Sequence, residues 1–119
     1  MGENVLNEIK KLSGLPPEDD SFDTDLLIYL NGLQLVLSQL GIKLSEGVVI
    51  DKDTTWEDLI DSSMSAYVFL TVKMYLSSKV RKIFDPPQSG TAMQSLDDLI
   101  AEYEWRLNVE VDPSELVSE

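Results

Sequence analysis

Phe84-Asp85-Pro86-Pro87 is the stretch that decides the fold, because it ends one long helical segment and separates it from a second one. The residue before a proline avoids the α-helical backbone region, and two successive prolines supply no amide donors to a helix. The preceding segment, Met64 to Phe84, is apolar in its first half and carries basic residues near its end. We therefore predict two long helices joined at a Pro-Pro turn.

The second of these helices is expected over Ala92 to Leu107, after a loop over Gln88 to Thr91. Its apolar residues recur at helical spacing, as Met93, Leu96, Leu99, Ile100, Tyr103 and Leu107. Residues 108–119 contain Pro113 and four acidic residues without a basic one. We therefore expect a helical domain over residues 1–107 and an acidic, flexible tail over residues 108–119, which could order on a partner.

Helices are also predicted in the first half of the chain, over Asn4 to Leu12 and Asp23 to Leu40. The second of these has a leucine stripe at helical spacing, formed by Leu26, Leu27, Leu30, Leu33, Leu37 and Leu40. Four further apolar residues widen the stripe, which predicts core contacts on more than one side of the helix; they are Ile28, Tyr29, Leu35 and Val36. Asp23 or Thr24 is expected to cap its start.

The middle of the chain carries a helix-start signal. Thr54-Thr55-Trp56-Glu57 fits a capping box, so a helix is expected to begin there and to pass through Ser62-Ser63 into the segment that ends at Phe84. Before it, Gly47 to Ile50 is rich in β-branched residues and predicts one short strand or an extended loop. The fold class expected is all-α, a small bundle of about four to five helices.

The composition limits the possible functions. The chain has 119 residues, which suits one domain, and a net charge of −13, which argues against nucleic acid or an anionic membrane as the principal partner. It has no cysteine, so there is neither a disulfide framework nor a thiol site. No apolar run is long enough to span a bilayer, and the start lacks an export pattern, so we expect synthesis in the cytoplasm and no membrane contact.

Catalytic patterns are missing. The chain has no histidine, no glycine-rich phosphate loop and no Gly-x-Ser-x-Gly motif. Acidic residues cluster over residues 18–25 and 51–61, but neither cluster has the spacing of a calcium loop, so we interpret both as solvated. We therefore predict no enzyme activity, no catalytic residue, no metal and no cofactor.

The charge is unevenly distributed along the chain. Residues 63–88 carry a net charge of +3, from four basic residues and Asp85, so the remainder carries −16. Two interpretations stay open. The basic patch of one copy could meet the acidic surface of the next, which closes into a ring if the rotation permits, or the basic residues could pair with the chain's own last helix.

Several of these segments resemble the small head-tail connector (adaptor) proteins of tailed bacteriophages. The likeness covers approximately residues 4–110, and it is carried by the long segment from Val72 to Arg81, by Phe84-Asp85-Pro86-Pro87 and by Glu104-Trp105-Arg106-Leu107-Asn108. The resemblance implies a structural virion protein, made in the host bacterial cytoplasm. It would join a ring under the portal protein and present a platform to the next connector or tail protein.

The resemblance and the basic patch together place the predicted partner or subunit interface on eight residues. These are Lys73, Lys79, Arg81, Lys82, Phe84, Trp105, Arg106 and Leu107. The alternative function is an acidic regulatory protein that imitates DNA and occupies a basic groove, and an enzyme using carboxylates alone ranks last.

Overall fold

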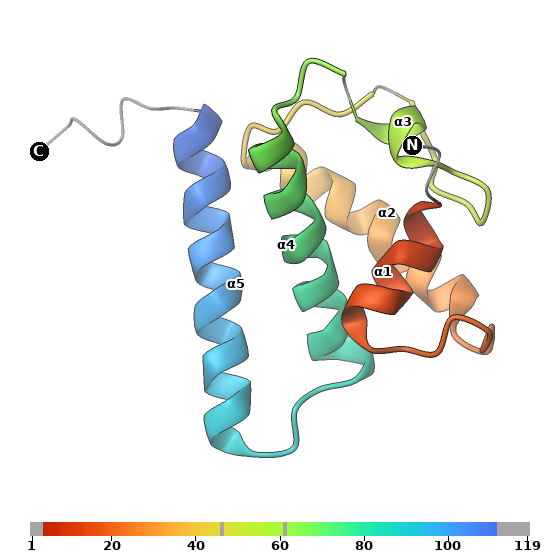
Figure 1. The fold of residues 1–119 in the computed structure, drawn as a ribbon, viewed down its shortest axis with the longest axis vertical. Helices are drawn as coiled ribbons and strands as arrows, with labels where there is room; N and C mark the ends of the chain where they lie inside the picture. Colours follow the sequence, from red (N-terminus) through yellow and green to blue (C-terminus); the bar gives the residue numbers. More distant parts are fainter. Residues whose placement is uncertain (1–3, 46, 61, 112–119) are drawn as a thin grey trace, which may run out of the picture.

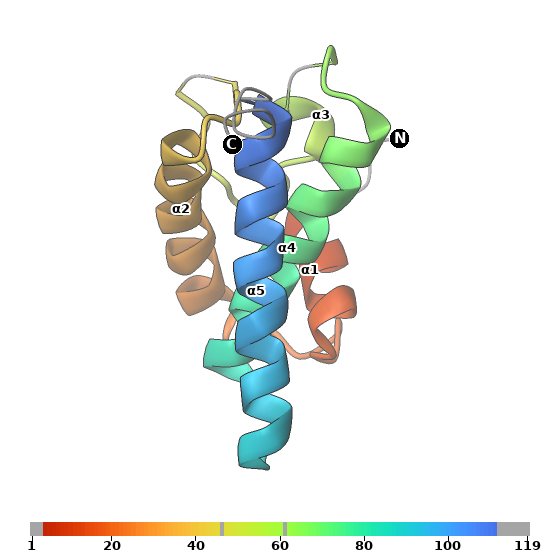
Figure 2. The ribbon, with the colours of Figure 1, turned by 90° about the vertical axis from the view of Figure 1, so that its left-hand side faces the viewer.

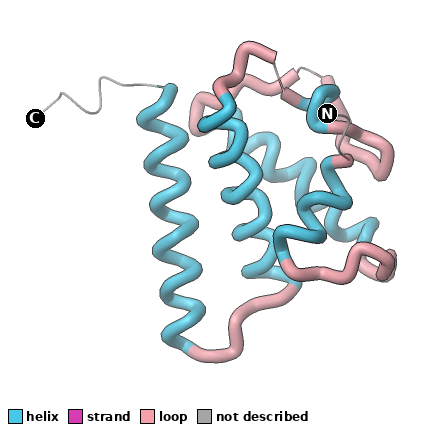
Figure 3. The backbone as a smooth tube through the Cα atoms, in the orientation of Figure 1, coloured by secondary structure: helices cyan, strands magenta, loops and turns pink. Residues whose placement is uncertain are grey.

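The computed structural model describes residues 4–45, 47–60 and 62–111, which form five helices (Figure 1). The helices are α1 (Val5–Ser13), α2 (Asp23–Gln39), α3 (Trp56–Leu59), α4 (Ala66–Phe84) and α5 (Gly90–Val111). Helices and loops account for the whole of this described part, with no strand in it (Figure 3). The prediction of a small all-α bundle is confirmed.

Helix α4 is the centre of the bundle, packed between α5 on one side and α1 and α2 on the other (Figures 1 and 2). Its side chains supply much of the core, and Val72, Tyr75 and Val80 are fully buried. Burying side chains of this size stabilises the fold by roughly 1.5–3 kcal/mol each before entropy is counted. The segment predicted as the longer helix before the prolines is therefore the element that the other helices cover.

The Pro-Pro turn stops α4 where the sequence predicts. The helix ends at Phe84, Asp85 leaves the helical conformation with φ −150° and ψ 62°, and the chain reverses so that α5 runs back beside α4 (Figure 1). Helix α5 begins at Gly90, two residues before the predicted start, and the Ser89 hydroxyl accepts a hydrogen bond from the Ala92 amide at 3.0 Å. This serine caps the helix and accounts for the earlier start.

The end of α5 lies beyond the predicted boundary. The helix continues through Val111, and Val109 is buried. The first residues assigned to the acidic tail, from Asn108 onward, are thus helical. The rest of that predicted tail, residues 112–119, lies outside the described part of the chain.

Four of the six leucines of the predicted stripe are buried, and Leu27 and Leu40 are partly buried. The buried residues of α2 are Leu26, Leu30, Leu33 and Leu37, and Tyr29 and Val36 pack partly buried against the core. The expectation that Ile28 and Leu35 also reach the core is wrong, because both lie about 180° around the helix from the buried stripe at roughly 100° per residue. The start of α2 also differs from the expectation, since neither Asp23 nor Thr24 caps it.

Phe22 occupies the N-cap position of α2 and offers no acceptor, so no side chain caps the helix, and the first helical residue is Asp23. Its carboxylate accepts a hydrogen bond from Lys10 Nζ at 2.8 Å, and that ammonium also donates to the carbonyls of Pro17 and Asp19 at 3.1 and 2.7 Å. Lys10 is buried, so its charge is taken up by groups of its own chain. The acidic loop between α1 and α2 is held against the bundle in this way.

The predicted continuous helix through residues 54–84 is wrong. The capping box is formed one residue later, by Thr55 and Asp58, and α3 ends after one turn. Ile60 then takes an extended conformation and forms an isolated β-bridge with Leu44, while Ser65 caps a new helix, α4. The backbone pairing with residue 44 and the serine cap together break the helix.

The β-branched segment from Gly47 to Ile50 was predicted to be either a short strand or an extended loop. The structure shows the extended loop. It is held by polar side chains of α2, since Asn31 exchanges hydrogen bonds with the backbone of Ile50 at 2.8 and 3.0 Å and Gln34 donates to the Val48 carbonyl at 3.0 Å. These side chains take the place of a neighbouring strand.

Candidate functional site

The basic residues of α4 are largely engaged inside the molecule. Lys73 Nζ lies 3.1 Å from a carboxylate oxygen of Glu8 in α1 and 4.4 Å from the ring centroid of Phe69. Glu8 also accepts a hydrogen bond from the Trp56 indole at 2.6 Å. Lys73 therefore contributes to the joint between α1, α3 and α4.

The end of α4 is tied to α5. Lys82 Nζ lies 2.6 Å from Asp97, and Lys79 Nζ lies 5.8 Å from the ring centroid of Tyr75. The pairing of Lys82 corresponds to the interpretation in which basic residues meet the chain's own last helix. Arg81 is exposed, and the described part of the chain offers it no ion-pair partner.

Two of the predicted interface residues pack inside the chain. Phe84 makes edge-to-face contacts with Phe22 and Tyr29, with ring centroids 6.3 and 6.1 Å apart. Leu107 is fully buried in the core. Trp105, two residues earlier, is 56% exposed because it lies about 180° around α5 from the buried stripe at roughly 100° per residue.

An apolar groove runs between α4 and α5. It has a volume of about 340 Å³, and its lining residues are Tyr67, Leu70, Thr71, Met74, Leu99, Glu102, Tyr103 and Arg106. The exposed side chains among them include Tyr67, Leu70 and Leu99. Of the eight predicted interface residues, Arg106 is the one that lines this groove.

The polar groups of the groove are paired with each other. Arg106 donates to the Glu102 carboxylate at 2.6 Å and to the Tyr67 hydroxyl at 2.6 Å. Glu102 and then Tyr67 raise the pKa of Arg106, so the guanidinium stays charged. Because the cation is matched by the carboxylate beside it, the groove is apolar and locally neutral.

A second apolar surface lies on the outer side of α2. Ile28 and Leu35 are 68% and 69% exposed, and the exposed Gly32 lies between them. The sequence carries no charged residue from Leu26 to Ile42. Sequence reasoning missed the α4–α5 groove and the outer side of α2, because it assigned every apolar residue at helical spacing to the core. The long uncharged run was the signal that could have indicated the surface of α2.

The family comparison identifies the class of protein. A family model described as phage connector protein matches residues 5–114. This chain belongs to the phage connector protein family. No match was found among curated proteins or among solved structures.

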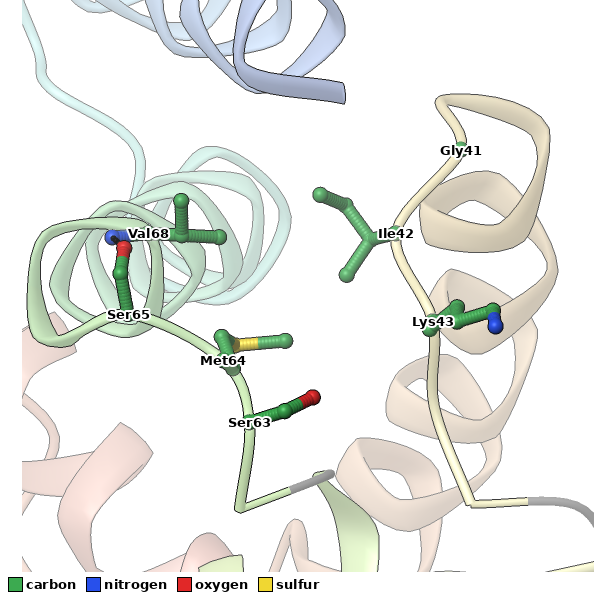
Figure 4. Close-up of a pocket in the computed structure, with 7 residues that line it drawn as sticks. All are labelled: Gly41, Ile42, Lys43, Ser63, Met64, Ser65 and Val68. Carbon is green, nitrogen blue, oxygen red and sulfur yellow. Dashed lines mark hydrogen bonds between the residues drawn. The ribbon is translucent and has the colours of Figure 1, made fainter.

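A hollow in this connector protein lies between the loop after α2 and the start of α4 (Figure 4). It has a volume of about 240 Å³, and its lining residues are Gly41, Ile42, Lys43, Ser63, Met64, Ser65 and Val68. The Ser65 hydroxyl accepts a hydrogen bond from the Val68 amide at 3.1 Å and so acts as the cap of α4. Figure 4 shows mainly apolar side chains facing the hollow, which gives it no catalytic set.

Tyr75 and Asp51, two titratable groups with shifted pKa values, make hydrogen bonds within the fold. The Tyr75 hydroxyl donates to Glu104 at 2.8 Å, and burial, followed by this hydrogen bond, raises the pKa of the tyrosine. The Asp53 amide and the Thr54 hydroxyl lower the pKa of Asp51 in the turn before α3. Within residues 4–45, 47–60 and 62–111 no three potential ligands are grouped to hold a metal ion.

The connector family is a family of structural proteins, and membership makes this chain a component of the phage particle. In the described part of the chain, no helix has the length and hydropathy of a membrane span.

Proposed function

We propose that this connector protein assembles as a ring under the portal protein and links the phage head to the next connector or tail protein. The observation that carries this function is the pair of uncovered apolar surfaces, the outer side of α2 and the α4–α5 groove. Uncovered apolar area of this kind is typical of protein–protein contact sites. A chain made in the bacterial cytoplasm would bury it on joining the virion.

We assign the exposed residues of the predicted interface to contacts between the ring and the proteins on either side of it, the portal protein and the tail protein. Trp105 projects from the outer side of α5, and Arg81 lies exposed near the end of α4. Tryptophan and arginine are enriched among residues that dominate binding energy. We expect these two side chains to contact the portal protein or the tail protein.

DNA mimicry, the alternative function, is less well supported, because several of the 22 acidic residues are engaged within the chain. An imitation of DNA needs free carboxylates along an exposed surface. Glu8, Asp23, Asp97 and Glu104 instead make hydrogen bonds or ion pairs with groups of their own chain. Specific nucleic-acid binding is not proposed either.

Electron microscopy of portal rings tests the proposed function. Purified portal rings from the same phage, incubated with excess connector protein, should gain a further layer of ring density. Portal rings that gain no density at any protein concentration would contradict it. Displacement of DNA from a DNA-binding protein by the connector protein would favour the alternative.

A further inference from the structure

The outer side of α2 contains a glycine that the monomer does not need. Gly32 has no positive φ, and a Cβ built on it meets nothing within 4 Å. Glycine inside a helix lowers stability by about 1 kcal/mol relative to alanine. No contact within the described part of the chain offsets this loss at Gly32. A glycine does, however, let a neighbouring backbone or side chain approach a helix closely.

The surface around Gly32 is also electrically neutral. Ile28 and Leu35 are seven residues apart, about 10 Å along the helix at roughly 1.5 Å per residue, and the run from Leu26 to Ile42 has no charge. The chain as a whole carries −13. Copies of so acidic a protein repel each other overall, so a contact between two neutral surfaces avoids the repulsion that a contact between two acidic surfaces would cost.

The α4–α5 groove is the other neutral apolar surface. Its cation and carboxylate, Arg106 and Glu102, are paired at 2.6 Å, and Leu70 is 56% exposed beside them. Figure 2 places α2 on one side of α5 and the first turns of α4, which supply Tyr67 and Leu70, on the other. One copy can therefore use both surfaces at once, each with a different neighbour.

From these observations we infer that neighbouring copies contact each other by docking the outer side of α2, at Ile28, Gly32 and Leu35, into the α4–α5 groove of the next copy. Two different surfaces on one chain give a head-to-tail contact, which closes into a ring when the rotation permits. The inference rests on the proposed function and names the contact that would build the ring.

Cysteine cross-linking tests the contact directly, because the natural chain has no cysteine. Full-length Leu35→Cys protein is mixed with full-length Leu70→Cys protein, and a mild oxidant is added. In one arm the mixture is concentrated without portal rings, and in the other arm portal rings are present. A disulfide between the two variants is expected in at least one arm. A control mixture of Leu35→Cys with Glu57→Cys, which lies outside both surfaces, should give at least tenfold less disulfide between the two variants.

Three outcomes would overturn the inference: no 35–70 disulfide in either arm, a dominant disulfide between two Leu35→Cys copies, or equal yield in the control mixture. Electron microscopy of the same portal samples keeps the proposed function separate. Added ring density without the 35–70 disulfide would retain the connector role and reject this contact.

Variants at Gly32 separate assembly from stability. Both Gly32→Ala and Gly32→Gln should raise the melting temperature of the monomer by about 3 °C, because either residue favours a helix over glycine. The alanine variant should keep the 35–70 cross-linking yield within about threefold, whereas glutamine should lower it at least tenfold. Unchanged yield in the folded glutamine variant would contradict close approach at Gly32.

Discussion

The basic end of α4 and the outer side of α2 differ in how the monomer uses them. Lys73 and Lys82, which the sequence marks as an assembly signal, are paired with Glu8 and Asp97 of the same chain. Ile28 and Leu35, which the sequence pattern assigns to the core, are uncovered. These two basic residues therefore help to hold the monomer together, whereas the exposed apolar side chains of α2 are the ones that the proposal assigns to assembly.

The largest expected effect comes from Leu107, for which Trp105, two residues earlier in the same helix, is the control. Leu107→Ala should lower the free energy of unfolding by about 2–5 kcal/mol, because the side chain is fully buried and its removal leaves a cavity. Trp105→Ala should change it by less than about 0.5 kcal/mol, as expected for an exposed position. Urea unfolding followed by circular dichroism measures both free-energy changes. Similar losses in the two variants would contradict the assignment of Leu107 to the buried side of α5 and Trp105 to its exposed side.

Lys10 tests the use of charge inside the monomer. Lys10→Met keeps the apolar length of the side chain but removes three hydrogen bonds to the loop and to Asp23, so it should lower the free energy of unfolding by about 2 kcal/mol. The matched control is Lys43→Met, at an exposed position in the loop after α2. Equal effects in the two variants would show that burial of the Lys10 ammonium does not matter.

Tyr75 gives a smaller effect with a defined pH dependence. Tyr75→Phe removes the hydrogen bond to Glu104 and should cost about 1 kcal/mol at neutral pH. Burial, followed by Glu104, raises the pKa of Tyr75 above its ordinary value of 10.0, so the unfolded chain releases the phenol proton at lower pH than the folded chain. The stability from this group is complete below pH 10 and is lost as the pH rises through the folded pKa.

Urea unfolding between pH 8 and about 11 should therefore show a shallower alkaline decline for Tyr75→Phe than for the natural chain. The same decline in both proteins would refute the role assigned to this tyrosine.

The smallest expected effect comes from the ion pair between α4 and α5. Lys82 and Asp97 are both partly exposed, so Lys82→Ala should lower the free energy of unfolding by about 0.5 kcal/mol, less at high salt. Thermal unfolding at low and high salt measures this difference. A loss that persists in high salt would mean that the side chain contributes through packing.

The parts of the fold that depend on local chemistry could be predicted from sequence. Two successive prolines after Asp85 stop the helix that precedes them, and the leucine stripe of α2 predicts one buried side, so both features follow from short segments. The break before α4 could not be read in this way. It depends on the pairing of Ile60 with Leu44, which is distant in sequence.

The exposed apolar surfaces were harder to predict than the fold. The exposure of Ile28 and Leu35 depends on which side of α2 the other helices cover, and periodicity alone cannot separate a wide core stripe from a second surface. The partner of Lys82 depends on the register between α4 and α5, which the turn sets only in three dimensions. The likeness to connector proteins could be recognised from short motifs because these lie along most of the chain.

The most direct test of the account is the salt dependence of the contact between copies, measured as the 35–70 disulfide yield on portal rings. If copies meet through neutral apolar surfaces, the yield should rise from about 20 mM to 500 mM salt, since salt screens the repulsion between chains of charge −13 and leaves apolar contact intact. A yield that falls steadily with salt would contradict the account, because it would mean that ion pairs, such as the basic end of α4 against acidic residues of the next copy, hold the copies together.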